Sequence, residues 1–189
     1  MGTQGFDEVI ATLKKAAAAL RGADVPFVLA GGLAAWARGG PESDHDLDLM
    51  VKETDADRAL DVLGAAGMRP ERPPEGWLYK AFDGDVMVDL IFLPVSGPVT
   101  DEHFERADRL EVEAVPMLVL ALEDVMTAKL LALGEHQLDY ESVLETARSL
   151  REQVDWEEVR RRTSDSPYAA AFFTLVEGLG IVVRPRTGR

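Results

Sequence analysis

The sequence predicts an α+β protein, in which a small mixed β-sheet of about five strands is flanked by helices and followed by a helical C-terminal subdomain. One observation is the stretch Phe27–Val51, where an apolar run, a glycine pair, a run of small residues and a second apolar run follow one another. A second is the two apolar segments joined by a turn at Asp83-Gly84, which are typical of a β-hairpin. A third is the helical spacing of apolar residues beyond Leu118.

We expect the chain to divide near Leu118. Residues 1–118 would form the sheet-containing core, and residues 119–189 would form a helical subdomain packed on it. No Gly-, Ser- or Pro-rich linker separates the two segments, which favours two coupled parts over two independent domains.

The first part of the chain alternates helices and strands. Apolar residues recur at helical spacing after Phe6, and Gly22 follows that run. Thr54 suits the N-cap of a helix that Gly67 ends. The expected elements are a helix over Phe6–Leu20, a strand over Val25–Ala30, a helix from Gly31-Gly32 to Arg38, a strand over Asp46–Val51, a helix over Thr54–Ala66, and a strand end with a Pro-rich turn over Met68–Pro74.

The second part of the chain begins with the hairpin and ends in helices. The hairpin strands are Trp77–Phe82 and Asp85–Leu93. Leu110–Ala114 alternates apolar and acidic residues, as an edge strand does, and the segment Pro116–Leu122 fits both a strand and a helix. The expected helices are Thr100–Ala107, Glu123–Leu133, Tyr140–Leu150, Asp155–Arg162 and Pro167–Leu179.

The composition excludes several kinds of site and partner. The chain has no cysteine, so disulfides and thiolate metal sites are excluded. Residues 1–139 hold 12 basic and 26 acidic side chains, which accounts for the whole net charge of −14. Such an acidic core is a poor surface for a long nucleic acid, whose affinity comes mainly from phosphate neutralisation. No signal-like region or bilayer-spanning apolar run is present, so we expect a cytoplasmic protein without a membrane partner.

Three carboxylates lie on segments that are otherwise apolar. Asp46 and Asp48 share one face of their strand because alternate residues of a strand point the same way. Such a pair repels unless a cation lies between its members, and Mg²⁺ prefers hard oxygen ligands and needs few protein groups. Asp89, in the apolar run Val86–Phe92, invites the same argument. Lysine or arginine partners are the alternative to a metal ion.

The glycine pair Gly31 and Gly32, the dyad Asp46 and Asp48, and the later carboxylate Asp89 together resemble the signature of the DNA polymerase β-like nucleotidyltransferase superfamily. The resemblance implies transfer of a nucleoside monophosphate from a nucleoside triphosphate to an acceptor, with Mg²⁺ or Mn²⁺ held by the three carboxylates. It implies that Asp89 is the general base. The glycine pair would let the backbone approach the triphosphate.

Three further residues would complete the nucleotide site. Ser43 precedes the dyad and can donate to a phosphate. The segment Glu123–Tyr140 resembles the superfamily branch with toxins of bacterial toxin–antitoxin and abortive-infection systems. By that resemblance Lys129 has a catalytic role in contacting the nucleotide phosphate, and Asp139 orients it. An ion pair of little energetic worth is the structural alternative.

The sequence departs from that branch at Glu42–Asp44, because an arginine commonly precedes the dyad there. Arg38 is the nearest replacement cation for a triphosphate. Outside the site, we expect a solvated helix face at Arg160–Arg162 and core or lid positions for the tryptophans Trp36, Trp77 and Trp156.

The sequence leaves the acceptor open. The toxin-like branch implies an RNA 3′ end and a cognate antitoxin protein as partner. The antibiotic-modifying branch implies a small hydroxylated molecule. A third alternative is a non-catalytic module of the same fold that binds a nucleotide or a partner. The intact carboxylates argue against this alternative, and the altered Glu42–Asp44 segment argues for it.

Overall fold

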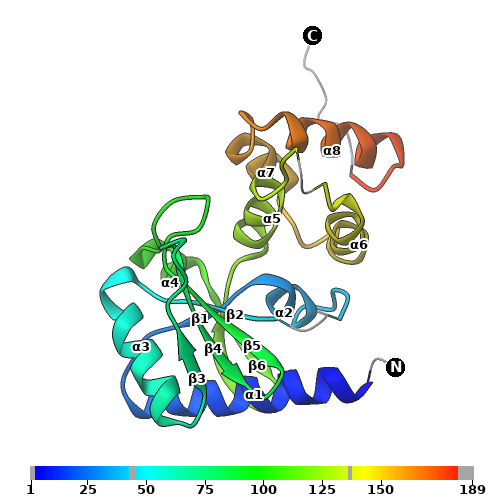
Figure 1. The fold of residues 1–189 in the computed structure, drawn as a ribbon. Coiled ribbons are helices and arrows are strands. Elements are labelled where there is room, and N and C mark those ends of the chain that lie inside the picture. The colour runs from blue at the N-terminus through cyan, green and yellow to red at the C-terminus, as the bar shows by residue number, and fades with distance from the viewer. Residues whose placement is uncertain (1–2, 43–45, 136–137, 183–189) are drawn as a thin grey trace.

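The computed structural model describes residues 3–42, 46–135 and 138–182, which form one mixed sheet of seven strands with helices around it (Figure 1). The strands are β1 (Val28–Leu29), β2 (Asp46–Met50), β3 (Arg69–Glu71), β4 (Leu78–Asp83), β5 (Val86–Ile91), β6 (Asp108–Val112) and β7 (Val115–Val119). Their order across the sheet is β3-β4-β5-β2-β1-β7-β6. The pairs β2–β5 and β1–β7 are parallel, and the other neighbours are antiparallel.

The helices are α1 (Thr3–Gly22), α2 (Gly31–Trp36), α3 (Glu53–Ala65), α4 (Asp101–Arg106), α5 (Leu122–Leu131), α6 (Tyr140–Leu150), α7 (Trp156–Arg162) and α8 (Pro167–Gly178). The predicted α+β class is confirmed, and the strand number of about five is too low. The two additional strands are β3 and β7. They come from the two segments whose structure the sequence left uncertain.

The first strand and the hairpin turn differ from their predicted limits. β1 is shorter than Val25–Ala30 because Val25 donates its N–H to Leu20 at the end of α1, and Pro26 has no N–H to give to a ladder. The hairpin turn is Gly84-Asp85 rather than Asp83-Gly84, since Asp83 pairs with Val86. Gly84 has φ +62°, and the favoured two-residue hairpin turns need a positive φ at their first position.

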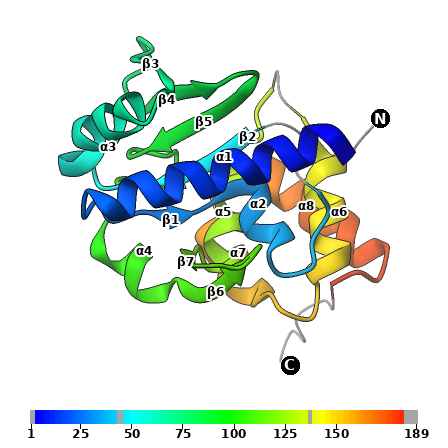
Figure 2. The same cartoon turned by 90° about the horizontal axis from the view of Figure 1, so that it is seen from below.

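The two faces of the central strands differ in character. On one face, Leu47, Leu49, Val88 and Leu90 are completely buried beneath α1 and α3, which lie across the sheet in Figure 2. Each such side chain contributes about 1.5–3 kcal/mol on burial. The alternate residues, which include all three predicted carboxylates, point to the opposite face. That face looks toward α2 and α5, so the site lies between the sheet and the first C-terminal helix.

The helices α5 to α8 gather beyond one edge of the sheet (Figure 1). Their centre is aromatic, because Phe172 and Phe173 of α8 are buried and their rings pack edge to face with centroids 5.8 Å apart. α5 is buried on nearly every side, which suits a helix that lies between the sheet and the other three helices. Among the described residues, no helix is both long and apolar enough to cross a membrane.

Candidate active site

The pairing of β2 with β5 brings two predicted carboxylates together. The parallel register places Asp48 opposite Asp89, and Asp46 opposite Met87. Because neighbouring strands lie about 4.8 Å apart, Asp48 and Asp89 stand side by side on one face. Asp46 lies one step along the same face and is exposed. The geometry therefore assembles the three predicted acids on one face of the neighbouring strands β2 and β5.

Gly31 is required by the carboxylate of Asp48. Ala30 donates its N–H to the Asp48 carbonyl oxygen at 2.9 Å, and the chain then turns into α2 with Gly31 at φ +57°. A Cβ at Gly31 would lie 1.8 Å from Oδ2 of Asp48. Both the left-handed backbone and the contact exclude any larger residue. A glycine at position 31 is thus explained by the backbone conformation and by the contact with Asp48, in addition to the predicted approach of a phosphate.

Asp48 lies in an environment that disfavours its negative charge. Burial raises its pKa from 3.8 to about 7, and repulsion from Asp89 and Asp46 adds to the rise. Lys129 and Lys80 act in the opposite direction without cancelling it. Asp48 is therefore a carboxylate that a further cation would stabilise.

Lys80 is a site residue that the sequence analysis missed. It faces Asp89 across the β4–β5 pair, and its Nζ donates to Oδ1 of Asp89 at 3.0 Å and contacts the sulfur of Met87 at 3.0 Å. The two charged side chains are only 23% and 13% exposed. Burial raises the pKa of Asp89, although the bond from Lys80 lowers it. The hairpin register would have revealed Lys80, because it sets which residue faces Asp89.

Lys129 reaches the same place from α5. Burial lowers its pKa, while Asp48 and then Asp139 act to raise it, so both acids lie within electrostatic range. Its Nζ donates to Oγ of Ser142 at 3.3 Å. The carboxylate of Asp139 caps α6 by accepting the N–H of Ser142 at 3.2 Å. Lys129 and Asp139 thus meet at Ser142, and the cap holds the partner of the lysine in place.

A cleft of about 220 Å³ opens beside Asp48 and Lys129, and Asp89 and Lys80 lie next to it without lining it. Its polar wall is formed by Asp48 and Lys129, with the glycine pair Gly31 and Gly32 at the turn into α2. The remaining lining is apolar: Ala30, Met50, Ile91, Pro94, Leu120, Val125, Ala128 and Ala132. Ser43, the predicted phosphate donor, lies outside the described residues together with Asp44 and His45.

A metal ion would have to draw the acids together. Within the described part of the chain, no three His, Asp or Glu side chains are already arranged to hold one. The donor set nevertheless fits a divalent cation, since Asp46, Asp48 and Asp89 offer hard oxygens on one face of two neighbouring strands. Burial, and then repulsion from Asp89 and Asp46, raise the pKa of Asp48, so a bound cation would favour its charged form.

One arginine prediction is wrong, and a second holds only for Arg161, whose side chain is exposed. Arg38 is not available to a triphosphate, because its side chain is 7% exposed and donates to Ala34, Val119 and Asp108. The run Arg160–Arg162 is not a uniformly solvated face. Arg160 lies over the ring of Phe173 with its guanidinium carbon 4.0 Å from the centroid, and Arg162 donates to Asp124 at 2.6 Å.

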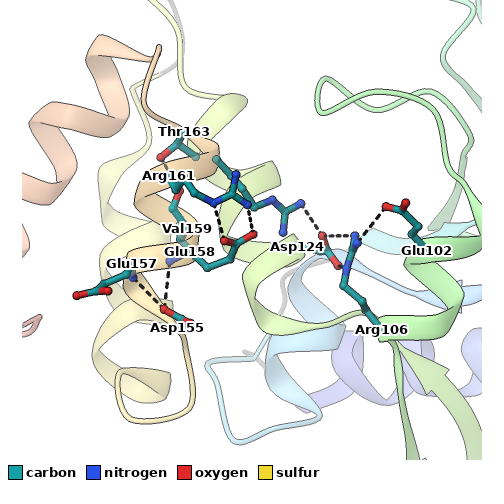
Figure 3. Close-up of polar contacts among 10 residues, drawn as sticks. Glu102, Arg106, Asp124, Asp155, Glu157, Glu158, Val159, Arg161 and Thr163 are labelled. Carbon is teal, nitrogen blue, oxygen red and sulfur yellow. Dashed lines mark hydrogen bonds and ion pairs between the residues drawn. The ribbon is translucent and has the colours of Figure 1, made fainter.

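The Glu-Asp pair at the start of α5 ties elements together, as Figure 3 shows around Asp124. The side chain of Asp124 is 3% exposed and accepts from Arg106 of α4 at 3.0 Å and from Arg162 of α7 at 2.6 Å. Glu123 accepts the N–H of Asp155, at the start of α7, at 2.8 Å. The resemblance linked this segment to the nucleotide site, but in the structure Asp124 joins α5 to both α4 and α7, and Glu123 joins α5 to the start of α7.

Comparison with known proteins gives one family and a set of similar folds. The family model described as uncharacterised nucleotidyltransferase matches residues 7–180. The solution structure of the antibiotic-resistance factor ANT(2'')-Ia is similar with a TM-score of 0.60 and 17% identity, over 92% of this chain and 96% of that one. The crystal structure of ANT(2'')-Ia with adenylyl-2''-tobramycin gives a TM-score of 0.59 and 18% identity, over 89% and 98%.

TM1012 from Thermotoga maritima is also similar, with a TM-score of 0.53 and 19% identity over 77% of this chain and 92% of that one. At these identities the likeness concerns the fold alone. None of the curated proteins matches the chain.

Proposed function

The chain belongs to this nucleotidyltransferase family, and from that premise we propose that it transfers a nucleoside monophosphate from a nucleoside triphosphate to a hydroxyl group of a small molecule. The observation that carries the proposal is the cleft in which Asp48, beside Asp89, faces Lys129 next to the Gly31-Gly32 turn. A structural ion pair would not need a buried carboxylate whose charged form is disfavoured, nor a glycine in contact with it.

In this reaction the acceptor oxygen forms a bond to the α-phosphorus while the bond from that phosphorus to the pyrophosphate oxygen breaks. The acceptor hydroxyl loses its proton, and pyrophosphate leaves with the electron pair of the broken bond. A divalent cation held by Asp46, Asp48 and Asp89 would lower the pKa of the acceptor hydroxyl and neutralise the leaving phosphates. The protein itself forms no covalent bond to the substrates, so its task is to position the acceptor and the triphosphate and to neutralise the phosphate charge.

Residues in and beside the cleft divide these tasks. Asp89 receives the acceptor proton, because burial raises its pKa toward the range where a carboxylate is an effective base. Lys80 holds Asp89 by a 3.0 Å bond, and we assign it the positioning of that carboxylate. Lys129 provides positive charge for the triphosphate and is held by Ser142 on the capped end of α6. The turn at Gly31 allows the phosphates to approach the backbone.

A small cationic acceptor fits the charge of the molecule better than RNA does. The net charge of −14 attracts amine-bearing molecules and repels a phosphate backbone. Arg160 and Arg162, which an RNA 3′ end would need, are engaged in internal contacts. The structure of ANT(2'')-Ia with adenylyl-2''-tobramycin adds weight to an amine-bearing antibiotic as the class of acceptor. RNA, with a cognate antitoxin as partner, is the rival proposal.

Transfer of radiolabel tests both proposals at once. The full chain is incubated with each α-labelled nucleoside triphosphate, Mg²⁺ or Mn²⁺, a panel of aminoglycosides, total RNA and whole-cell protein. We expect label on a small molecule, only when metal is present, and none with Asp48→Asn. Label on RNA would overturn the small-molecule acceptor. A protein that binds nucleotide and transfers label to nothing would overturn the enzyme and favour the non-catalytic module.

A further inference from the structure

A second hollow opens beside the catalytic cleft and is larger than it. Its volume is about 580 Å³, and its lining is Trp77, Ile91, Leu93, Pro94, Val95, Ala128 and Ala132. Four of these residues, Ile91, Pro94, Ala128 and Ala132, also line the cleft of Asp48 and Lys129. The two spaces therefore adjoin each other along these four residues. We call the second space the Trp77 hollow.

The Trp77 hollow exposes large apolar side chains to solvent. Trp77 and Leu93 are each 41% exposed and Val95 is 66% exposed, so Trp77 is not the core residue that one sequence alternative predicted. Its backbone is fixed, because its carbonyl oxygen accepts the N–H of Phe92 at 3.2 Å and that of Leu93 at 3.1 Å. An apolar patch of this kind at the mouth of a cleft is typical of a binding surface.

We propose that the Trp77 hollow binds the nucleobase of the nucleoside triphosphate, with the base stacked on the indole of Trp77. The proposal rests on the function proposed above. The direction of the strands supports it, since Met50 and Ile91 lie two residues beyond Asp48 and Asp89 on the same face. At about 3.3 Å per residue, that step carries the site about 7 Å from the carboxylates toward the hollow. This displacement is within the span of one nucleoside.

The chemistry of the lining selects the base over the other parts of the reaction. Among the described residues that line the Trp77 hollow, none is charged and none carries an amide side chain. A triphosphate or a polyamine would lose its hydration there without gaining a partner. A nucleobase can stack on an aromatic ring whatever its identity. We therefore expect the enzyme to discriminate weakly between bases and to favour purines, which offer the larger ring face.

Calorimetric titration with and without a base tests the assignment. The probes are ATP and inorganic tripolyphosphate, each with Mg²⁺, on the full chain. Trp77→Ala should weaken ATP binding about 10-fold and leave tripolyphosphate binding unchanged, because only ATP loses a stacking partner. Trp77→Phe should restore most of the ATP affinity. Trp156→Phe is the matched control, since Trp156 packs on Phe173 in the helical part and should alter neither ligand.

Each other outcome overturns the assignment in a different way. Unchanged ATP affinity in Trp77→Ala would mean that the base does not bind in the Trp77 hollow. A higher KM for the acceptor in that variant would mean that the acceptor binds there instead. Equal losses for ATP and tripolyphosphate would mean that Trp77 acts through the fold. A wild-type protein that binds both probes equally would overturn the base site alone, whereas one that binds neither would overturn the proposed function as well.

Discussion

Replacing Asp48 with asparagine should make the metal-free protein more stable while removing its metal site. In the folded chain, burial and the neighbouring acids raise the pKa of Asp48 from 3.8 to about 7. The folded state therefore holds the proton more tightly than the unfolded state, and the free energy of unfolding falls as the pH rises from about 4 to about 7. Asparagine has nearly the same shape and no charge, so the variant lacks this pH-dependent loss.

The size of the effect follows from the shift. A change of about 3 pKa units corresponds to about 4 kcal/mol at 1.36 kcal/mol per unit. Asp48 is not fully enclosed, and solvent screening reduces the figure to about 2 kcal/mol. For a chain of this length each kcal/mol moves the Tm by about 2–4 °C, so we expect Asp48→Asn to gain about 4–8 °C at about pH 8. The gain should shrink to a small remainder near pH 4, where the carboxyl is protonated in the folded state and about half protonated in the unfolded state.

The assay is thermal and urea unfolding, followed by circular dichroism in a chelator, at several pH values between about 4 and 8. Asp85→Asn is the control, because Asp85 is an exposed acid in the hairpin turn and its loss should leave the pH dependence unchanged. Adding Mg²⁺ or Mn²⁺ should then stabilise the wild type by about 2.7 kcal/mol at 100 times the Kd. It should leave Asp48→Asn unaffected.

Two results would refute this account. An asparagine variant that is less stable than the wild type at about pH 8 without metal would mean that the charge of Asp48 is already compensated in the fold. An equal metal-induced shift in both proteins would mean that the ion binds elsewhere on this acidic chain.

Three further variants test the architecture around the site. Gly31→Ala should lower the Tm more than Gly84→Ala, because both positions have positive φ, +57° and +62°, but only the first Cβ meets Asp48; equal losses would assign the whole effect to the backbone. Lys80→Met should destabilise the metal-free protein and enlarge the shift that Mg²⁺ produces, and an unchanged metal shift would show that the lysine does not compete for the acids. Asp124→Ala should cost about 2–3 kcal/mol in urea unfolding, below the full value for a buried pair because Arg162 is partly buried but Arg106 is exposed, and a loss below 1 kcal/mol would mean that solvent replaces the pair.

Local patterns in the sequence predict part of the candidate site. The two-residue period of a strand places Asp46 and Asp48 on one face, and β2 presents them in that way. The glycine pair marks the sharp turn from β1 into α2. The C-terminal helices follow from apolar spacing, and their observed limits lie within two residues of the predicted ones. Period, turn chemistry and capping are properties of neighbouring residues, so a single sequence contains them.

Tertiary contacts alone decided which residue meets which across the chain. The pairing of Asp48 with Asp89 and the arginines around Asp124 join segments that are far apart in sequence, and the pairing of Lys80 with Asp89 depends on the exact register of the hairpin. The exposure of a side chain also depends on tertiary packing. The residues next to Trp77 in sequence do not indicate that it lines an open hollow, and those next to Arg38 do not indicate that it is enclosed. A charge or a ring acquires its role from its partners, and the register of strands and the packing of helices bring those partners together only in the folded chain.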